Sequence, residues 1–132
     1  MQHQIETAIG TYIAAQGYTR AVEVGFGGKT IAAEILQTAG IPVLCTDVHA
    51  YPASSVPAVV DDCVEPQLSL YQDADLIYAI RPGVEIVPAL IRLAQQINAD
   101  LLVYHLGFEV YMGGGERIPV GDIMLHRYAV RR

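Results

Sequence analysis

Residues 21–30 of this chain read AVEVGFGGKT, and this stretch decides the fold. A short apolar run leads into the glycine cluster Gly25, Gly27 and Gly28, which opens a segment of helical character over residues 29–38. This order of strand, tight turn and helix is typical of doubly wound α/β folds, where the turn and the helix N-terminus approach a nucleotide. Glycine suits the turn because a Cβ would obstruct both the backbone geometry and the ligand. We therefore predict a nucleotide-cofactor domain.

Composition bounds the class of protein. The chain of 132 residues is long enough to bury a core and is expected to form one domain over residues 1–132. Its net charge of −6 argues against a nucleic-acid partner, which needs a basic face. No apolar run approaches the ~20 residues of a membrane span, and no signal peptide is visible. We expect a cytoplasmic protein without membrane association, in which Cys45 and Cys63 are buried thiols.

The rest of the chain alternates between helical and extended segments. Apolar residues at helical spacing predict a helix over residues 2–16, which Gly17 ends. The run LIYAI at 76–80 is apolar throughout, so we expect it at the centre of a parallel sheet. Further elements are predicted as strands at 20–24, 43–47, 58–61 or 62, and 101–106, helices at 29–38 and 84–97, a loop at 48–57 and a helical turn near 66–71.

The C-terminal part differs in kind. Gly113, Gly114, Gly115 and Gly121 divide it into two short segments that predict a hairpin, ending in an edge strand around residues 124–130. The arginines of the final HRYAVRR are interpreted as a solvated tail. The alternation of strands and helices predicts right-handed crossovers. The expected fold is α/β, a three-layer doubly wound Rossmann-like sheet, mostly parallel, with a C-terminal antiparallel hairpin or edge strand.

Charged residues end the predicted strands. Glu23 precedes the glycine turn, Asp47 ends the second strand, Asp61 or Asp62 ends the third, and Arg81 ends the fourth. Ligands bind outside the carboxyl ends of such strands, so these side chains are expected to converge. Asp47 stands 20 positions after Gly27, a spacing that suits hydrogen bonds to ribose hydroxyls. Arg81 is expected either to bind a carboxylate or phosphate or to neutralise Glu23 or Asp62.

The glycine turn allows three interpretations. A phosphate-binding loop of the Walker type fails, because Glu23 stands where that loop needs a glycine. A dinucleotide fingerprint fits Gly25 and Gly27 but places Thr30 at its third glycine, and the Glu23 carboxylate would repel a pyrophosphate. The third interpretation explains Glu23 better.

The run Glu23-Val24-Gly25-Phe26-Gly27-Gly28 resembles motif I of the class I S-adenosylmethionine-dependent methyltransferases. The resemblance implies that Glu23 serves the amino-acid end of the cofactor, that Asp47 binds the ribose and that Asp62 lies near the adenine. Lys29 departs from the motif, which usually has its last glycine there, and a cation at this helix N-terminus leaves an anionic ligand open. The predicted cofactor-binding set is Glu23, Gly25, Phe26, Gly27, Gly28, Asp47, Val48, Asp61, Asp62 and Arg81.

The whole chain, with its ADLIYAIRPG segment and glycine-rich end, also resembles a family of small uncharacterised archaeal proteins with a methyltransferase-like fold. The leading hypothesis is an S-adenosylmethionine-binding domain of methyltransferase type, with the methyl acceptor held by short loops or at an interface with another copy or a protein partner. The alternatives are a non-catalytic nucleotide-sensing or partner-binding module and an NAD or flavin domain. His49 and His105 are each a candidate acid or base or a structural histidine. No metal-ligand spacing is present.

Overall fold

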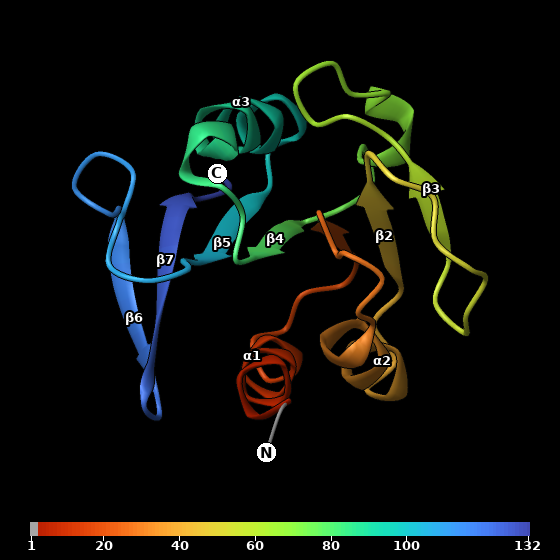
Figure 1. Cartoon of the computed structure of the whole chain (residues 1–132), viewed down its shortest axis with the longest axis horizontal. Helices are drawn as coiled ribbons and strands as arrows, with labels where there is room; N and C mark the ends of the chain where they lie inside the picture. The colour runs from red at the N-terminus through yellow and green to blue at the C-terminus, as the bar shows by residue number, and fades with distance from the viewer. Residues whose placement is uncertain (1–2) are drawn as a thin grey trace.

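One sheet of seven strands, in the order β3-β2-β1-β4-β5-β7-β6, organises the computed structural model, which describes residues 3–132 (Figure 1). The strands β1 to β5 run parallel, whereas β7 is antiparallel to both β5 and β6. Their bounds are Ala21–Val24, Val43–Asp47, Ala58–Val60, Leu76–Ile80, Asp100–Tyr104, Glu116–Val120 and Ile123–Ala129 for β1 to β7.

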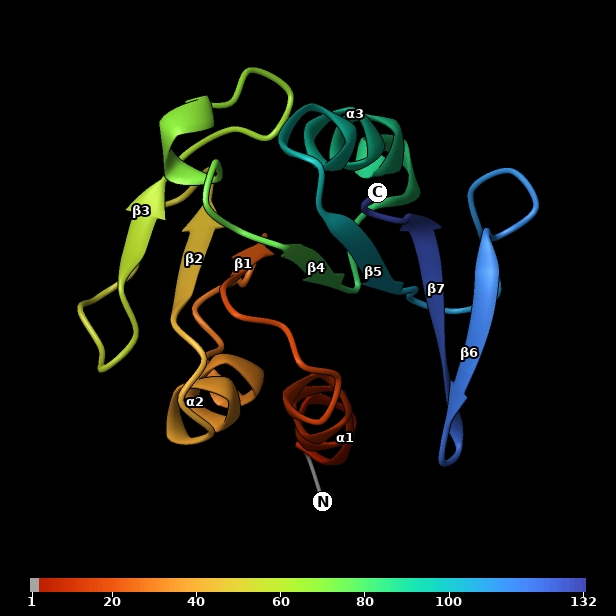
Figure 2. The same cartoon turned by 180° about the vertical axis from the view of Figure 1, so that it is seen from behind.

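Helices cover both faces of the sheet. The helices α1 (Gln4–Ala14) and α2 (Ile31–Thr38) lie on one face, while α3 (Val87–Ile97) and the short 3-10 turn η1 (Leu68–Leu70) lie on the other (Figures 1 and 2). A second 3-10 turn, η2 (Val84–Ile86), leads into α3. Each face carries its own apolar core. The three-layer, mostly parallel architecture expected from the sequence is therefore confirmed.

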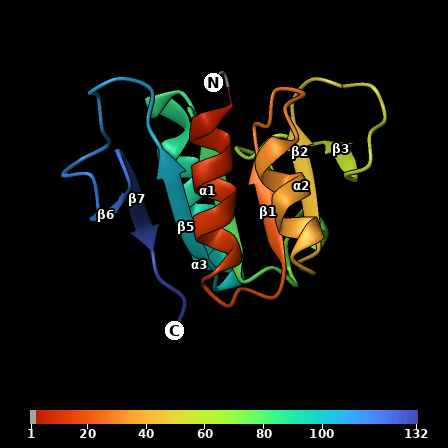
Figure 3. The same ribbon diagram turned by 90° about the horizontal axis from the view of Figure 1, so that it is seen from below.

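The directions of the elements place the candidate site. Figure 3 shows that β1 and β5 point toward the end of the molecule where α1 begins. Because α1 runs back along the sheet, its first turn lies at the carboxyl edge, beside the glycine turn that follows β1. An acidic side chain on the first turn of α1, Glu6, can therefore reach the ends of β1 and β4.

The C-terminal strands depart from the prediction in one respect. The segment predicted as an edge strand is β7, which lies between β5 and β6, so the edge assignment is wrong. The reason is burial, because Leu125, His126 and Ala129 of β7 are buried while β6 is largely exposed. Pro119 lacks an N–H and is tolerated in β6, since β6 is the strand at the edge.

Several predicted ends shift by a few residues. The helix expected over 2–16 covers Gln4–Ala14, and residue 2 lies outside the described residues. The helix expected from residue 29 begins at Ile31, because Lys29 still belongs to the turn, where its N–H donates to the carbonyl of Phe26 at 3.0 Å. The strand β3 ends at Val60, so Asp61 and Asp62 follow it instead of ending it.

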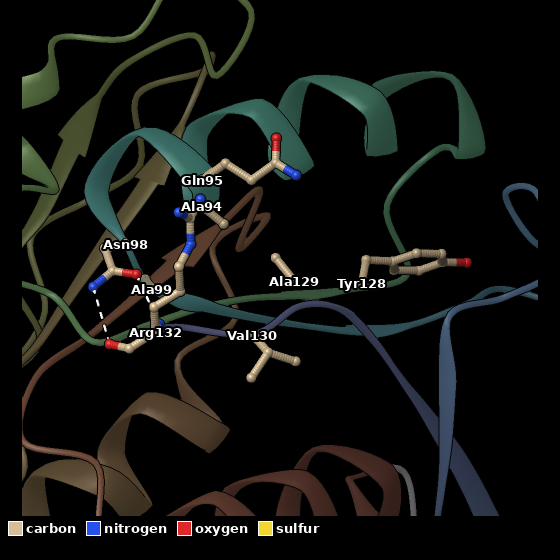
Figure 4. A pocket seen from close by; sticks show the side chains of 8 residues that line it. All are labelled: Ala94, Gln95, Asn98, Ala99, Tyr128, Ala129, Val130 and Arg132. Atoms are coloured by element: carbon tan, nitrogen blue, oxygen red, sulfur yellow. Dashed lines mark hydrogen bonds between the residues drawn. The ribbon is translucent and has the colours of Figure 1, made fainter.

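The final residues are held to the amino edge of the sheet, so their interpretation as a solvated tail is wrong. Asn98, which ends α3 in the left-handed conformation, accepts from the N–H of Arg132 at 2.9 Å (Figure 4). Arg131 donates its N–H to Asp100 at 2.7 Å and forms an ion pair with Asp75 at 3.3 Å. A hollow of about 250 Å³ remains between α3 and these residues, far from the glycine turn in the fold.

Cys45 and Cys63 are buried free thiols, as expected. Within residues 3–132, none of the helices has the length and apolar character needed to cross a membrane.

Candidate functional site

The glycine turn begins where β1 ends. The N–H of Gly25 donates to the carbonyl of Thr46 on β2 at 2.7 Å, which anchors the turn to the neighbouring strand. Gly28 has a φ of +78°, and a Cβ there would lie 2.8 Å from the ring of Tyr51. This ring also packs edge-on against Phe26, with 5.2 Å between the ring centroids. The loop after β2 therefore covers one side of the turn, and glycine is needed at position 28.

A hollow of about 140 Å³ lies on the other side of the turn. It is bounded by the ends of β1 and β4 and by the first turn of α1. Its lining combines acidic, basic and apolar side chains with bare backbone: Glu6, Glu23, Gly25, Phe26, Gly27, Lys29, Ile80 and Arg81.

Glu23 is the buried acid of this hollow. Its side chain is 2% exposed, and the Tyr78 hydroxyl donates to its Oε1 at 2.8 Å. Burial raises the pKa of Glu23 to about 7, the Tyr78 hydrogen bond opposes this rise, and the nearby Glu6 charge adds to it. Near neutral pH the carboxyl group is therefore divided between its charged and neutral forms.

Arg81 is paired with an acid that the sequence analysis did not consider. Its Nη1 lies 3.2 Å from Oε2 of Glu6 on α1, so the alternative in which Arg81 neutralises Glu23 or Asp62 is wrong. Although burial works to raise the pKa of Glu6, the hydrogen bond and charge of Arg81 hold it below its usual range. Arg81 also has a φ of +57°, a conformation that side chains other than glycine rarely adopt.

A signal for Glu6 was present in the sequence. Glu6 precedes Ile9 and Ile13 by three and seven positions, so it lies on the apolar stripe of α1 and is buried with them. An acid on the buried face of a helix needs a partner. Its position in the first turn places that partner at the carboxyl edge of the sheet.

Asp47 holds the glycine turn together. Its Oδ2 accepts from the N–H of Gly27 at 3.0 Å, and its Oδ1 accepts from the N–H of His49 at 3.0 Å. Asp47 is 9% exposed, whereas the following Val48 is exposed. The carboxylate expected to meet a ribose thus already orients the backbone that lines the hollow.

The two carboxylates after β3 lie elsewhere. Asp61 accepts from the Tyr71 hydroxyl at 2.5 Å and from the N–H of Gln67 at 3.1 Å. Asp62 is exposed and accepts from the N–H of Val64 at 2.9 Å within its own turn. Of the predicted set, the hollow brings together Glu23, Gly25, Phe26, Gly27 and Arg81, with Asp47 bonded to its backbone, while Gly28, Val48, Asp61 and Asp62 do not line it.

Metal binding finds no support in the described residues. Across residues 3–132, no three side chains of His, Cys, Asp or Glu gather in a way that could hold a metal ion.

The strand order and the glycine turn after β1 define the class as a methyltransferase-like Rossmann fold. The structure of a SAM-dependent methyltransferase from Archaeoglobus fulgidus superimposes with a TM-score of 0.62 at 16% identity, over 80% of this chain and 53% of that one. Cofactor-bound Rv0187 from MTB gives a TM-score of 0.58 at 18% identity, over 76% and 55%. The chain spans about half the length of these proteins, and at this identity the likeness shows the fold.

The chain belongs to UPF0146, an uncharacterised protein family, whose model matches residues 6–119. A UPF0146 protein of Archaeoglobus fulgidus is 38% identical over 96 residues, which cover 72% of this chain and 74% of the relative. UPF0146 protein PH0209 of Pyrococcus horikoshii is 32% identical over 107 residues, covering 77% and 76%. The resemblance to a small uncharacterised archaeal family is thus confirmed.

Proposed function

We propose that this chain binds S-adenosylmethionine at the glycine turn, as the cofactor domain of a methyltransferase. The observation that carries the proposal is the hollow beside Gly25 and Gly27, which combines a buried acid with two cations. The amino-acid end of the cofactor is a zwitterion, whose ammonium group needs an acid and whose carboxylate needs a cation. Glu23 accepts hydrogen bonds from the ammonium group, and Arg81 and Lys29 face the carboxylate. Lys29, which departs from motif I, thereby has a role as a cation that faces the carboxylate of the cofactor.

The size of the hollow limits which part of the cofactor enters it. About 140 Å³ is smaller than the ~300 Å³ of an ordinary ligand pocket, so only the amino-acid end fits inside. The adenosine end lies along Asp47 and the exposed Val48. A carboxylate offers about four lone-pair positions, and two on Asp47 are taken by the N–H groups of Gly27 and His49. The others remain for ribose hydroxyls.

The contribution of the chain to catalysis is positioning. The bound cofactor supplies an electrophilic methyl group, and the chain fixes its direction through Glu23 and the turn that Asp47 holds. Arg81 is already oriented by Glu6, so it loses little freedom when it meets a carboxylate.

A second candidate function is a nucleotide-sensing or partner-binding module without catalysis. Two contacts favour it, because the Asp47 carboxylate and the Tyr51 ring already hold the glycine turn. A turn that is complete without a ligand can also serve as a rigid surface. In this alternative the turn binds a nucleotide such as ATP or NAD, or a partner.

Separate titrations with S-adenosylmethionine, S-adenosylhomocysteine, NAD and ATP test these functions. The readouts are the amide chemical shifts of Gly25, Gly27, Gly28 and Asp47 and the heat of binding. We expect shifts with the two sulfur-containing ligands alone. Responses to NAD or ATP alone, or no response to any ligand, would overturn the proposal in favour of the second function.

A matched pair of variants identifies the acid. We expect Glu23→Gln to weaken S-adenosylmethionine binding about tenfold, the equivalent of one charge-assisted hydrogen bond. Glu65→Gln removes an exposed carboxylate outside the hollow and leaves the affinity unchanged. Equal affinity in both variants would exclude Glu23 from the site.

A further inference from the structure

A second pocket lies at the same edge of the sheet, where β5 ends and β7 begins. It has a volume of about 440 Å³ and is separate from the hollow at the glycine turn. We call it the histidine pocket, and its lining is Tyr104, His105, Gly107, Phe108, Val110, Arg117, Asp122, Ile123, Met124 and His126. Nothing in the proposed function uses these groups.

The hydrogen bond of His126 fixes the form of its ring. The ring is 6% exposed, and its Nδ1 lies 2.6 Å from the carbonyl oxygen of Gly114. A carbonyl only accepts hydrogen bonds, so Nδ1 carries a proton, and in the neutral ring Nε2 carries a lone pair. This Nε2 has no hydrogen-bond partner among residues 3–132. The pocket thus contains an oriented acceptor for an O–H or N–H group.

His105 packs against the His126 ring and is itself held by a hydrogen bond. Its Nε2 lies 2.6 Å from the Tyr128 hydroxyl, which also accepts from the N–H of Tyr111 at 3.2 Å. The rings of His105 and His126 meet edge to face, with 4.9 Å between their centroids. Burial lowers the pKa of His105, and the neighbouring His126 lowers it further. His105 therefore stays neutral near pH 7 and adds no charge to the pocket.

Arg117 supplies a cation without a partner. Its side chain makes no ion pair or hydrogen bond within the part of the chain that the structure describes. Its guanidinium is free to bind a carboxylate or phosphate with two hydrogen bonds. Asp122 is the acidic side chain in the described lining of the pocket and opposes such an anion.

Apolar side chains complete the lining. Phe108 is fully exposed to solvent and Met124 is exposed to 39%, beside the half-buried Val110 and Ile123. An exposed group of apolar side chains beside oriented polar and charged groups is typical of a ligand site. A ligand with an apolar body would remove this surface from water.

We propose that the histidine pocket binds a small organic acid that has an apolar body and a hydroxyl group. The anionic group binds Arg117, the hydroxyl donates to Nε2 of His126, and the body contacts Phe108 and Met124. The proposal is independent of S-adenosylmethionine binding, since none of these residues lines the hollow at the glycine turn. The two sites are neighbours, because Tyr104 lines the histidine pocket and its ring lies 5.6 Å from the guanidinium carbon of Arg81.

Three probes separate the parts of this ligand, namely 4-hydroxybenzoate, benzoate and 4-hydroxybenzamide. They are titrated into the whole chain without cofactor, so the result does not depend on the proposed function. The readouts are the heat of binding and the imidazole resonances of His126. We expect 4-hydroxybenzoate to bind about tenfold more tightly than benzoate, which lacks the hydroxyl, or 4-hydroxybenzamide, which lacks the charge. Equal affinities, or no binding of 4-hydroxybenzoate at millimolar concentration, would overturn the proposal.

Variants with exposed side chains avoid a loss of folding. We expect Arg117→Gln to weaken 4-hydroxybenzoate binding about tenfold and Phe108→Ala about fivefold, while Asp122→Asn strengthens it. Arg92→Gln, on the exposed side of α3, is the matched control and leaves the affinity unchanged. If Arg117→Gln and Arg92→Gln bind equally well, the anion does not lie on Arg117 and the assignment is wrong.

Discussion

The glycine turn and the histidine pocket lie at the same edge of one sheet, but they use their polar groups differently. At the turn, Glu23 is held by Tyr78 and Asp47 by backbone N–H groups. In the histidine pocket, the guanidinium of Arg117 and the Nε2 of His126 have no partner among residues 3–132. The difference indicates that the carboxylates at the turn already hold the fold together, whereas the groups at the pocket are open to the ligand that we propose for it. Removing the backbone acceptor Asp47 at the turn should therefore reduce stability, whereas substitutions at the pocket should affect only binding.

The largest effect expected is the pH dependence that Glu23 gives to stability. Its pKa is about 7 in the folded chain against 4.5 for an ordinary glutamate. Between these values the folded state holds a proton that the unfolded state has lost, so the free energy of unfolding falls as the pH rises from 4.5 to about 7. The decrease is about 3 kcal/mol at ~1.4 kcal/mol per unit and levels off above the folded pKa.

Urea unfolding at a series of pH values, with wild type compared against Glu23→Gln, measures this decrease. The variant lacks the titrating group and should lose this component of the pH dependence. Parallel profiles for the two proteins would mean that Glu23 titrates normally and that burial does not raise its pKa.

The next effect concerns Asp47. Asp47→Ala removes the acceptor of two backbone N–H groups and should lower the free energy of unfolding by about 2–3 kcal/mol. Asp62→Ala is the control, because this exposed carboxylate makes one local hydrogen bond, and its removal should cost at most about 1 kcal/mol. Chemical denaturation gives both values, and equal losses would contradict the special role of Asp47.

A smaller effect is expected at Gly28. Gly28→Ala places a Cβ in the left-handed region and against the Tyr51 ring, which should cost about 1–2 kcal/mol. Adding Tyr51→Ala relieves the contact but not the backbone strain, so part of the loss should return in the thermal midpoint. No recovery at all would show that the cost is entirely conformational.

The ion pair at the hollow should contribute less. Arg81→Gln is expected to cost about 1 kcal/mol, since the guanidinium is partly exposed while Glu6 is buried. A double-mutant cycle with Glu6→Gln measures the coupling between the two side chains. A coupling that is unchanged at high salt would contradict a mainly electrostatic interaction.

The smallest effect belongs to the histidine pocket. Arg117→Gln and Phe108→Ala remove exposed groups that have no ion pair, so the free energy of unfolding should stay within about 0.5 kcal/mol of wild type. Denaturation curves check this expectation. A larger loss would place these residues in the structural framework and remove the contrast between the two regions.

The sequence predicted the parts of the fold that depend on local pattern. The glycine turn, the LIYAI run and the helical stripe of α1 are each defined by a short stretch of consecutive sequence. The order of β6 and β7 was not predictable in this way, because the sequence pattern of a hairpin is the same whichever of its strands pairs with β5. The order follows from the burial of β7 side chains against the rest of the sheet, whereas β6 is largely exposed.

The candidate site was predictable where residues follow strand ends, as Glu23, Asp47 and Arg81 do. Its other contributors come from elements whose relation to the turn appears only after folding. Glu6 reaches it from α1, and Tyr78, within the run expected at the centre of the sheet, donates its hydroxyl to Glu23. Whether Asp61 and Asp62 meet a cofactor stays a prediction.

The inserted position of β7 constrains how the nascent chain completes its sheet. The strand β6 is synthesised before β7, yet β7 is its sole strand partner in the described sheet. Until β7 emerges, the open side of β5 has no neighbour and β6 has no strand to pair with. Either β6 and β7 pair first and add to β5 as a hairpin, or β7 adds to β5 before β6 pairs with it. In both cases this side of the sheet forms only after β7 has been synthesised.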